Sequence, residues 1–93
     1  MTELTPRLRR RLEADFEGHA DRLAHELENL PDSIRSDQDP ERIQAAVLLG
    51  SRGSHQAFAE MLALARLDWR DLLVSAGLEN ADHPKVMNSQ LGT

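Results

Sequence analysis

PERIQAAVLLG, residues 40–50, carries the strongest structural signal in the sequence. Asp39 and Pro40 resemble a helix start, because aspartate caps helix N-termini and proline favours the first helical position. The apolar residues that follow point in almost every direction around a helical axis: Ile43, Ala45, Ala46, Val47, Leu48 and Leu49. A helix with apolar side chains on nearly all sides is buried by other protein segments on nearly all sides. We therefore expect this helix at the centre of the domain or between two subunits.

Two upstream segments have apolar residues at helical spacing, which predicts two amphipathic helices. The apolar face of the first comprises Leu4, Leu8, Leu12 and Phe16. The apolar face of the second comprises Ala20, Leu23, Ala24, Leu27 and Leu30. Thr5 is the expected cap of the first helix, Gly18 its stop, and Pro31 the end of the second helix, since proline interrupts helical hydrogen bonding. Residues 1–30 should form a helical hairpin or one kinked helix, and residues 31–39 a polar connection.

Two further helices are predicted downstream, where Ser54 and Asp68 are suitable N-cap residues. The apolar side of the first comprises Ala57, Phe58, Met61, Leu62, Leu64 and Ala65. The apolar side of the second comprises Trp69, Leu72, Leu73 and Ala76. Gly77 then provides a left-handed stop. We expect residues 40–78 to form the helical core and residues 79–93 to form a turn and a short helix.

The predicted fold class is all-α: a compact bundle of four to five short helices in one domain, residues 1–93. The sequence has only two isoleucines and three valines, no tyrosine and no alternating apolar run, so it gives no strand signal.

Composition excludes several classes of function. Eleven basic residues against sixteen acidic ones give a net charge of −5, which disfavours binding to nucleic acid or to an anionic membrane. The absence of cysteine excludes a disulfide scaffold, a zinc–thiolate site and a cysteine nucleophile. No apolar run is long enough to span a membrane, and no signal-peptide segment is present. We therefore expect a cytoplasmic protein.

Two segments carry a resemblance to known proteins. Residues 42–49 read RIQAAVLL and residues 68–78 read DWRDLLVSAGL. This chain resembles, over residues 42–84, a group of small uncharacterised bacterial proteins, chiefly actinobacterial. The resemblance implies a helical fold in the bacterial cytosol and brings no assigned activity. Those relatives commonly have a second tryptophan at the position of His83, before Pro84. The resemblance therefore does not extend to this position.

The sharpest charge feature is a cluster of four arginines in the first predicted helix: Arg7, Arg9, Arg10 and Arg11. Acidic residues four positions away could pair with three of them, as Glu3 with Arg7, Arg9 with Glu13 and Arg11 with Asp15. The leading interpretation is thus an ion-paired, solvated face. The alternatives are a docking patch for an acidic partner protein and a nucleic-acid site.

Trp69 and Arg70 belong to residue types that are enriched at protein interfaces. The spacing of Trp69 to the apolar residues of its helix first predicts a core anchor, with an interface contact as the alternative. A small domain also has few helices with which to cover an all-round apolar helix. We therefore predict a homodimer in which Leu48 or Leu49, with or without Trp69, forms the shared face.

The histidines and serines predict no reaction centre. Asp15 with His19, and Asp21 with His25, are carboxylate–imidazole pairs, but a metal site needs three or four ligands. We therefore predict no catalytic, cofactor or metal site. The function that remains is a non-enzymatic protein–protein interaction or regulatory module that self-associates. The alternatives are a nucleic-acid-binding protein that uses the arginines of residues 7–11, and a small ligand-binding protein with a site between subunits.

Overall fold

The computed structural model describes residues 2–34 and 38–92. All regular secondary structure in this part of the chain is helical. It contains α1 (Pro6–Asp15), α2 (Ala20–Ser33), α3 (Pro40–Ser51), α4 (His55–Leu67), α5 (Trp69–Ala76) and α6 (His83–Leu91). No strand occurs within these residues, which confirms the all-α class. The described residues form six helices, more than the predicted four to five, because α1 and α2 are separate helices and the C-terminal segment adds α6.

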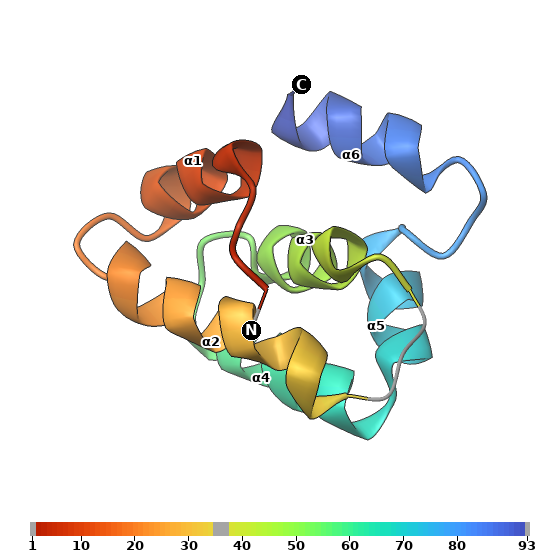
Figure 1. Ribbon diagram of the computed structural model, residues 1–93, viewed down its shortest axis with the longest axis horizontal. Coiled ribbons are helices and arrows are strands. Elements are labelled where there is room, and N and C mark those ends of the chain that lie inside the picture. Colours follow the sequence, from red (N-terminus) through yellow and green to blue (C-terminus); the bar gives the residue numbers. More distant parts are fainter. Residues whose placement is uncertain (1, 35–37, 93) are drawn as a thin grey trace.

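Helix α3 lies in the middle of the molecule and packs against all five other helices. Figure 1 shows α1 and α6 above it, α2 and α4 below it and α5 beside it. Its residues from Ile43 to Leu48 are buried, including the polar Gln44. The predicted central position is therefore confirmed. A single chain supplies the cover that this helix needs.

The helix signals of the central and C-terminal segments are confirmed at atomic detail. The Asp39 side chain accepts from the backbone N–H of Glu41 at 3.0 Å, and the Ser54 hydroxyl oxygen accepts from that of Ala57 at 3.2 Å. Asp68 caps α5 in the same way. Satisfying these otherwise unpaired N–H groups fixes where each helix begins.

Glycines separate elements where the backbone needs a positive φ. Gly77 has φ +74° at the end of α5, and the Leu78 N–H donates to the Leu73 carbonyl at 2.8 Å. This pattern is the Schellman stop. Gly18 has φ +85° between α1 and α2, so the hairpin is confirmed and the single kinked helix is wrong.

One predicted helix boundary and one predicted cap bond need correction. Thr5 is the N-cap residue of α1 as predicted, but its hydroxyl makes no cap bond and donates to the Glu41 carboxylate of α3 instead. Helix α2 does not end at Pro31 and continues to Ser33. Proline lacks the N–H that would reach the Leu27 carbonyl, and the buried Gln44 amide donates to that carbonyl instead, at 3.1 Å. A side chain from α3 thus replaces the missing backbone donor.

The last helix follows the predicted pattern. Met87 is buried, and Val86 and Leu91 pack against the core. The predicted polar connection of residues 31–39 lies partly outside the described residues, and its first three residues belong to α2. None of the described helices is both long enough and apolar enough to cross a lipid bilayer.

The two segments that carry the resemblance contact each other. Helix α3 packs against α5, and the Arg42 Nε donates to the Leu78 carbonyl at 2.9 Å. These residues hold the centre of the fold together, which is a structural role.

Candidate functional site

An open groove of about 360 Å³ lies between α2 and α4. Its floor consists of Leu23 from α2 and of Phe58 and Leu62 from α4, all of which are buried among the core residues. Ala59 and Ala63 line the α4 wall and are exposed. Because these alanines are short, a bound segment can come close to the backbone of α4.

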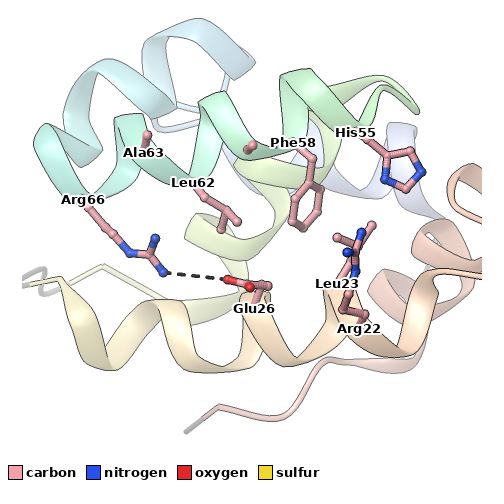
Figure 2. A pocket seen from close by; sticks show the side chains of 9 residues that line it. Arg22, Leu23, Glu26, His55, Phe58, Leu62, Ala63 and Arg66 are labelled. Atoms are coloured by element: carbon pink, nitrogen blue, oxygen red, sulfur yellow. Dashed lines mark ion pairs between the residues drawn. The ribbon is translucent and has the colours of Figure 1, made fainter.

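The spacing of residues along each helix builds the groove. On α4, residues 55, 59, 63 and 66 follow each other at intervals of four, four and three, which places them on one face. The distance from His55 to Arg66 along the helix is about 16 Å, since each residue adds about 1.5 Å. On α2, Arg22 and Glu26 are four apart and face the same side. Figure 2 shows His55 and Arg22 toward one end of the groove and Arg66 with Glu26 toward the other.

Basic groups outnumber acidic ones along this groove. Arg22, His55 and Arg66 line it together with a single carboxylate, Glu26. The Arg66 Nη2 and the Glu26 Oε2 are 4.0 Å apart, and each side chain is 49% exposed. Arg22 forms no ion pair with any residue that the structure describes. On a chain of net charge −5, this groove is a local basic surface.

His55, at one end of the groove, belongs to a cluster of aromatic side chains. The His55 ring makes edge contacts with Phe16, at 5.1 Å between centroids, and with His19, at 4.9 Å. Phe16 in turn contacts Phe58 at 5.4 Å. Asp15 pairs with Arg11 at 2.9 Å and forms no ion pair with His19 among the described residues. Among residues 2–34 and 38–92, no group of three potential metal ligands occurs.

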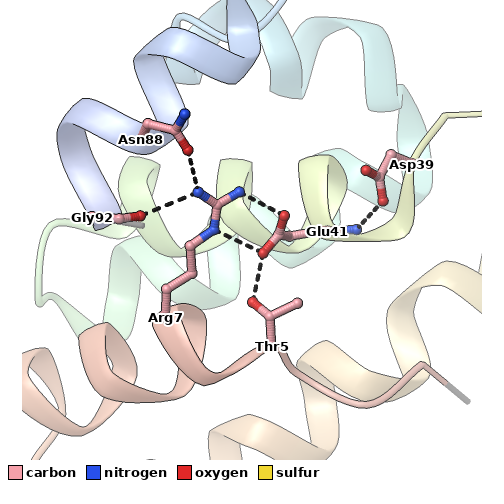
Figure 3. A network of polar contacts seen from close by, with 6 residues as sticks. All are labelled: Thr5, Arg7, Asp39, Glu41, Asn88 and Gly92. Atoms are coloured by element: carbon pink, nitrogen blue, oxygen red, sulfur yellow. Dashed lines mark hydrogen bonds and ion pairs between the residues drawn. The ribbon is translucent and has the colours of Figure 1, made fainter.

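The arginine cluster is largely used for contacts within the molecule. Arg7 reaches from α1 to α3, where its Nε and Nη2 donate to the two oxygens of Glu41 at 3.0 and 2.7 Å. Its Nη1 donates to the Asn88 side chain at 2.6 Å and to the Gly92 carbonyl at 3.2 Å. Figure 3 shows this junction of α1, α3 and α6. The hydrogen bond from Arg7 lowers the pKa of Glu41 and likewise raises the pKa of Arg7.

The remaining arginines of the cluster differ from one another. Arg11 pairs with Asp15 at 2.9 Å, as predicted. Arg9 lies 3.8 Å from a carboxylate oxygen of Glu28 on α2, and at the same distance from one of Asp21. Arg10 is exposed and forms no ion pair within the described part of the chain.

Two of the predicted pairings are therefore wrong. Glu3 does not pair with Arg7, and Glu13 does not pair with Arg9, because carboxylates on other helices take their places. The cluster binds α1 to its neighbours. Arg10 is exposed without an ion pair among the described residues, and Arg9 is 41% exposed with carboxylate contacts of 3.8 Å.

The other predicted interaction residues lie in different places. Leu48 is fully buried within the chain and has no surface to offer to a second copy. Leu49 and Trp69 are half-buried against the core. The Arg70 guanidinium lies over the Trp69 ring, 5.3 Å from its centroid. Beside Trp69 and Arg70, Val74 is 59% exposed, and these three residues line a shallow hollow on α5.

The groove residues were not identified from the sequence. Arg22, Ala59, Ala63 and Arg66 have no motif, and each helix alone shows only an ordinary polar face. The one available signal is that the short alanines at 59 and 63 stand one residue after the core positions 58 and 62. Their role depends on the proximity of α2 and α4, which local periodicity does not reveal.

Comparison with known proteins gives no match: no family model fits the chain, and no curated protein or solved structure is significantly similar to it. The resemblance to actinobacterial proteins stays a prediction. The groove must be interpreted from its own chemistry.

Proposed function

We propose that this protein is a small non-enzymatic interaction module that binds an amphipathic segment of a partner protein in the groove between α2 and α4. The observation that carries the proposal is the combination of an apolar floor with a basic rim on an acidic chain. Apolar side chains of the partner would cover Ala59 and Ala63. Acidic side chains of the partner would meet Arg22 and Arg66.

The shape of the groove supports a chain segment as its ligand. The α4 wall runs for about 16 Å, which corresponds to roughly three turns of a bound helix. The groove is open to solvent, whereas sites for small molecules enclose most of the ligand surface. Because its floor residues are already buried, most of the new apolar contact comes from the two alanines. We therefore expect a modest affinity, in the micromolar range of about −8 kcal/mol.

The nucleic-acid alternative has less support. A phosphate-binding surface needs several accessible cations in a row. Of the arginines in residues 7–11, Arg7, Arg9 and Arg11 contact carboxylates of the same chain. Arg10 and the 41% exposed Arg9 are too few for such a row, and their attraction is weak on a chain of net charge −5.

Selection from a displayed peptide library tests the proposal. The full chain is immobilised, and we expect enriched peptides to carry apolar residues flanked by aspartate or glutamate. Ala63→Glu places a longer, acidic side chain on the groove wall and should weaken binding of these peptides at least about tenfold, or about 1.4 kcal/mol. Ala14→Glu is the matched control, because Ala14 is also an exposed helical alanine but lies on α1.

Two results would contradict the proposal. One is a selection without enrichment. The other is a set of peptides that bind wild type and Ala63→Glu equally well. A duplex DNA probe, tested in parallel over a range of salt concentrations, would favour the nucleic-acid alternative if it bound with a steep salt dependence.

We propose self-association as a separate property, which the hollow on α5 supports better than α3 does. Trp69 is half-buried there and Val74 is 59% exposed. Light scattering on a size-exclusion column should give twice 10.4 kDa for the wild type and 10.4 kDa for Val74→Asp. A wild-type mass of 10.4 kDa at high micromolar concentration would refute the homodimer.

A further inference from the structure

We infer that the groove recognises a carboxylate of its partner at Arg66, and that Glu26 occupies this place in the free protein as an internal competitor. The inference rests on the proposed function of the groove. It adds the residue that sets the preference for acidic partners. It also names the contact that binding must replace.

The pair of Arg66 and Glu26 has the geometry of a replaceable contact. Figure 2 shows it crossing from α4 to α2 at one end of the groove. One nitrogen and one oxygen meet at 4.0 Å, and both side chains are 49% exposed. Such exposed single contacts contribute about 0–1 kcal/mol. A guanidinium can bind a carboxylate through two parallel hydrogen bonds, so a well-placed ligand carboxylate makes a better contact than Glu26 does.

Glu26 also has another position available after it leaves Arg66. Arg22 lies one turn earlier on α2 and has no ion pair among the described residues. Side chains four apart on a helix are neighbours, and an ion pair there contributes about 0.3–0.5 kcal/mol. The Glu26 side chain can therefore rotate from Arg66 to Arg22 with little change in free energy. The groove end that contains Arg66 becomes free for the partner.

The charges identify the class of partner. Without Glu26, the charged groups that line the groove are Arg22 and Arg66, with Ala59 and Ala63 on the α4 wall. This arrangement is complementary to a segment with apolar residues in its middle and a carboxylate toward the Arg66 end. An acidic amphipathic helix of about three turns has this pattern.

Two synthetic peptides test the inference. The acidic probe is an amphipathic, fluorescein-labelled peptide of three helical turns in which glutamates flank leucines, and the neutral probe has glutamine in place of each glutamate. Binding to the full chain is measured by fluorescence anisotropy. Glu26→Gln removes the competitor and should tighten binding of the acidic probe about two- to fivefold, the fold-change that corresponds to a weak exposed ion pair. Binding of the neutral probe should change much less.

Arg66→Gln is the decisive companion variant. It breaks the same ion pair as Glu26→Gln, so a purely structural effect would move both variants in the same direction. We expect the opposite: Arg66→Gln should weaken binding of the acidic probe and reduce the preference for it over the neutral one. Glu13→Gln is the matched control for charge, because Glu13 is an exposed helical glutamate that lies on α1 and does not line the groove. It should change binding less than Glu26→Gln does.

The outcomes separate this inference from the proposed function. If the acidic probe binds wild type but Glu26→Gln leaves its affinity unchanged or weaker, the internal competitor is refuted while the groove remains a binding site. If both probes bind equally well, recognition of a carboxylate at Arg66 is refuted. If neither probe binds wild type or Glu26→Gln, the inference and the proposed function both fail.

Discussion

Two pairs of arginine and glutamate in this molecule have the same chemistry and different surroundings. Arg7 and Glu41 join through two hydrogen bonds of 3.0 and 2.7 Å, and their side chains are 18% and 17% exposed. Arg66 and Glu26 meet once, at 4.0 Å, with both side chains 49% exposed. The first pair joins α1 to α3 and, through Arg7, to α6. The second lies across an open groove.

The surroundings of each pair distinguish an arginine that holds the fold together from one that can bind a partner. A half-buried guanidinium that donates four hydrogen bonds, as Arg7 does, cannot leave its acceptors without a penalty, because those acceptors would stay unpaired. A guanidinium in solvent exchanges its partner at little cost. Sequence alone makes the cluster of residues 7–11 the obvious binding surface. The observed contacts favour Arg66 as the binding residue, because it lines the groove and has a single carboxylate contact of 4.0 Å.

The largest expected effect is at the first pair. Replacing Glu41 with alanine should lower the free energy of unfolding by about 1.5–3 kcal/mol, because it removes charge-assisted hydrogen bonds from a half-buried arginine. Urea denaturation of wild type, Arg7→Ala, Glu41→Ala and the double variant gives the coupling energy between the two residues. A coupling below about 0.5 kcal/mol would mean that this pair is no more structural than an exposed one.

A second fixed polar contact should have a somewhat smaller effect. Gln44→Leu keeps the volume in the core but removes the donor to the carbonyls of Leu27 and Thr2, and should cost about 1–2 kcal/mol. Pro31→Ala restores a backbone N–H that can reach the Leu27 carbonyl. It should therefore stabilise the Gln44→Leu variant more than it stabilises wild type. Equal effects of Pro31→Ala in both backgrounds would show that Gln44 does not compensate for the proline.

Part of the stability that the Arg7–Glu41 pair provides should depend on pH, because Glu41 is titratable. The hydrogen bond from Arg7 holds the pKa of Glu41 below its usual 4.5 in the folded state. The resulting stability is fully present above the unfolded-state pKa and is lost as the pH falls through the folded-state pKa. The stability difference between wild type and Glu41→Gln should thus be constant near pH 7 and shrink below about pH 4.5. A difference that grows as the pH falls would contradict this direction.

The smallest expected effect is at the second pair. Arg66→Gln, Glu26→Gln and their combination should each change the free energy of unfolding by less than about 0.5 kcal/mol, with a coupling in the same range. Thermal unfolding followed by circular dichroism is sufficient to show this. A coupling above about 1 kcal/mol would place this pair beside Arg7 and Glu41 as a structural contact.

Much of the fold follows from local sequence, because helix signals act over one turn. The spacing of Leu8, Leu12 and Phe16 predicted a buried face, and Asp39 and Asp68 predicted helix starts. Leu67 is not part of the apolar side predicted for its helix, and it is 85% exposed. These predictions concern interactions between neighbours in the sequence.

The errors arise where a distant residue changes a local outcome. Pro31 should end α2, and a side chain from α3 supplies the donor that the proline lacks. Thr5 should cap α1, and the Glu41 carboxylate attracts its hydroxyl instead. Neither partner can be chosen from local spacing, because many polar residues compete for such roles.

The candidate site was less predictable than the fold. The sequence directed attention to clustered charge and to the tryptophan, which are conspicuous in one dimension. The groove is formed by residues from two helices, and its exposed alanines become visible only when α2 and α4 lie together. Of the two α3 residues predicted for a shared face, Leu48 is buried within the chain and Leu49 is half-buried, because the other five helices pack around α3, and their positions do not follow from the sequence.

The most direct test of the account is a nuclear magnetic resonance titration of the isotope-labelled full chain with the acidic peptide. Binding in the groove should produce saturable shifts of the backbone signals of Arg22, Ala59 and Ala63, with the Trp69 indole signal unchanged. The neutral peptide should produce smaller shifts at the same positions. Shifts confined to α1 or α5, or no shifts at millimolar peptide, would contradict the claim that the groove between α2 and α4 is the binding surface.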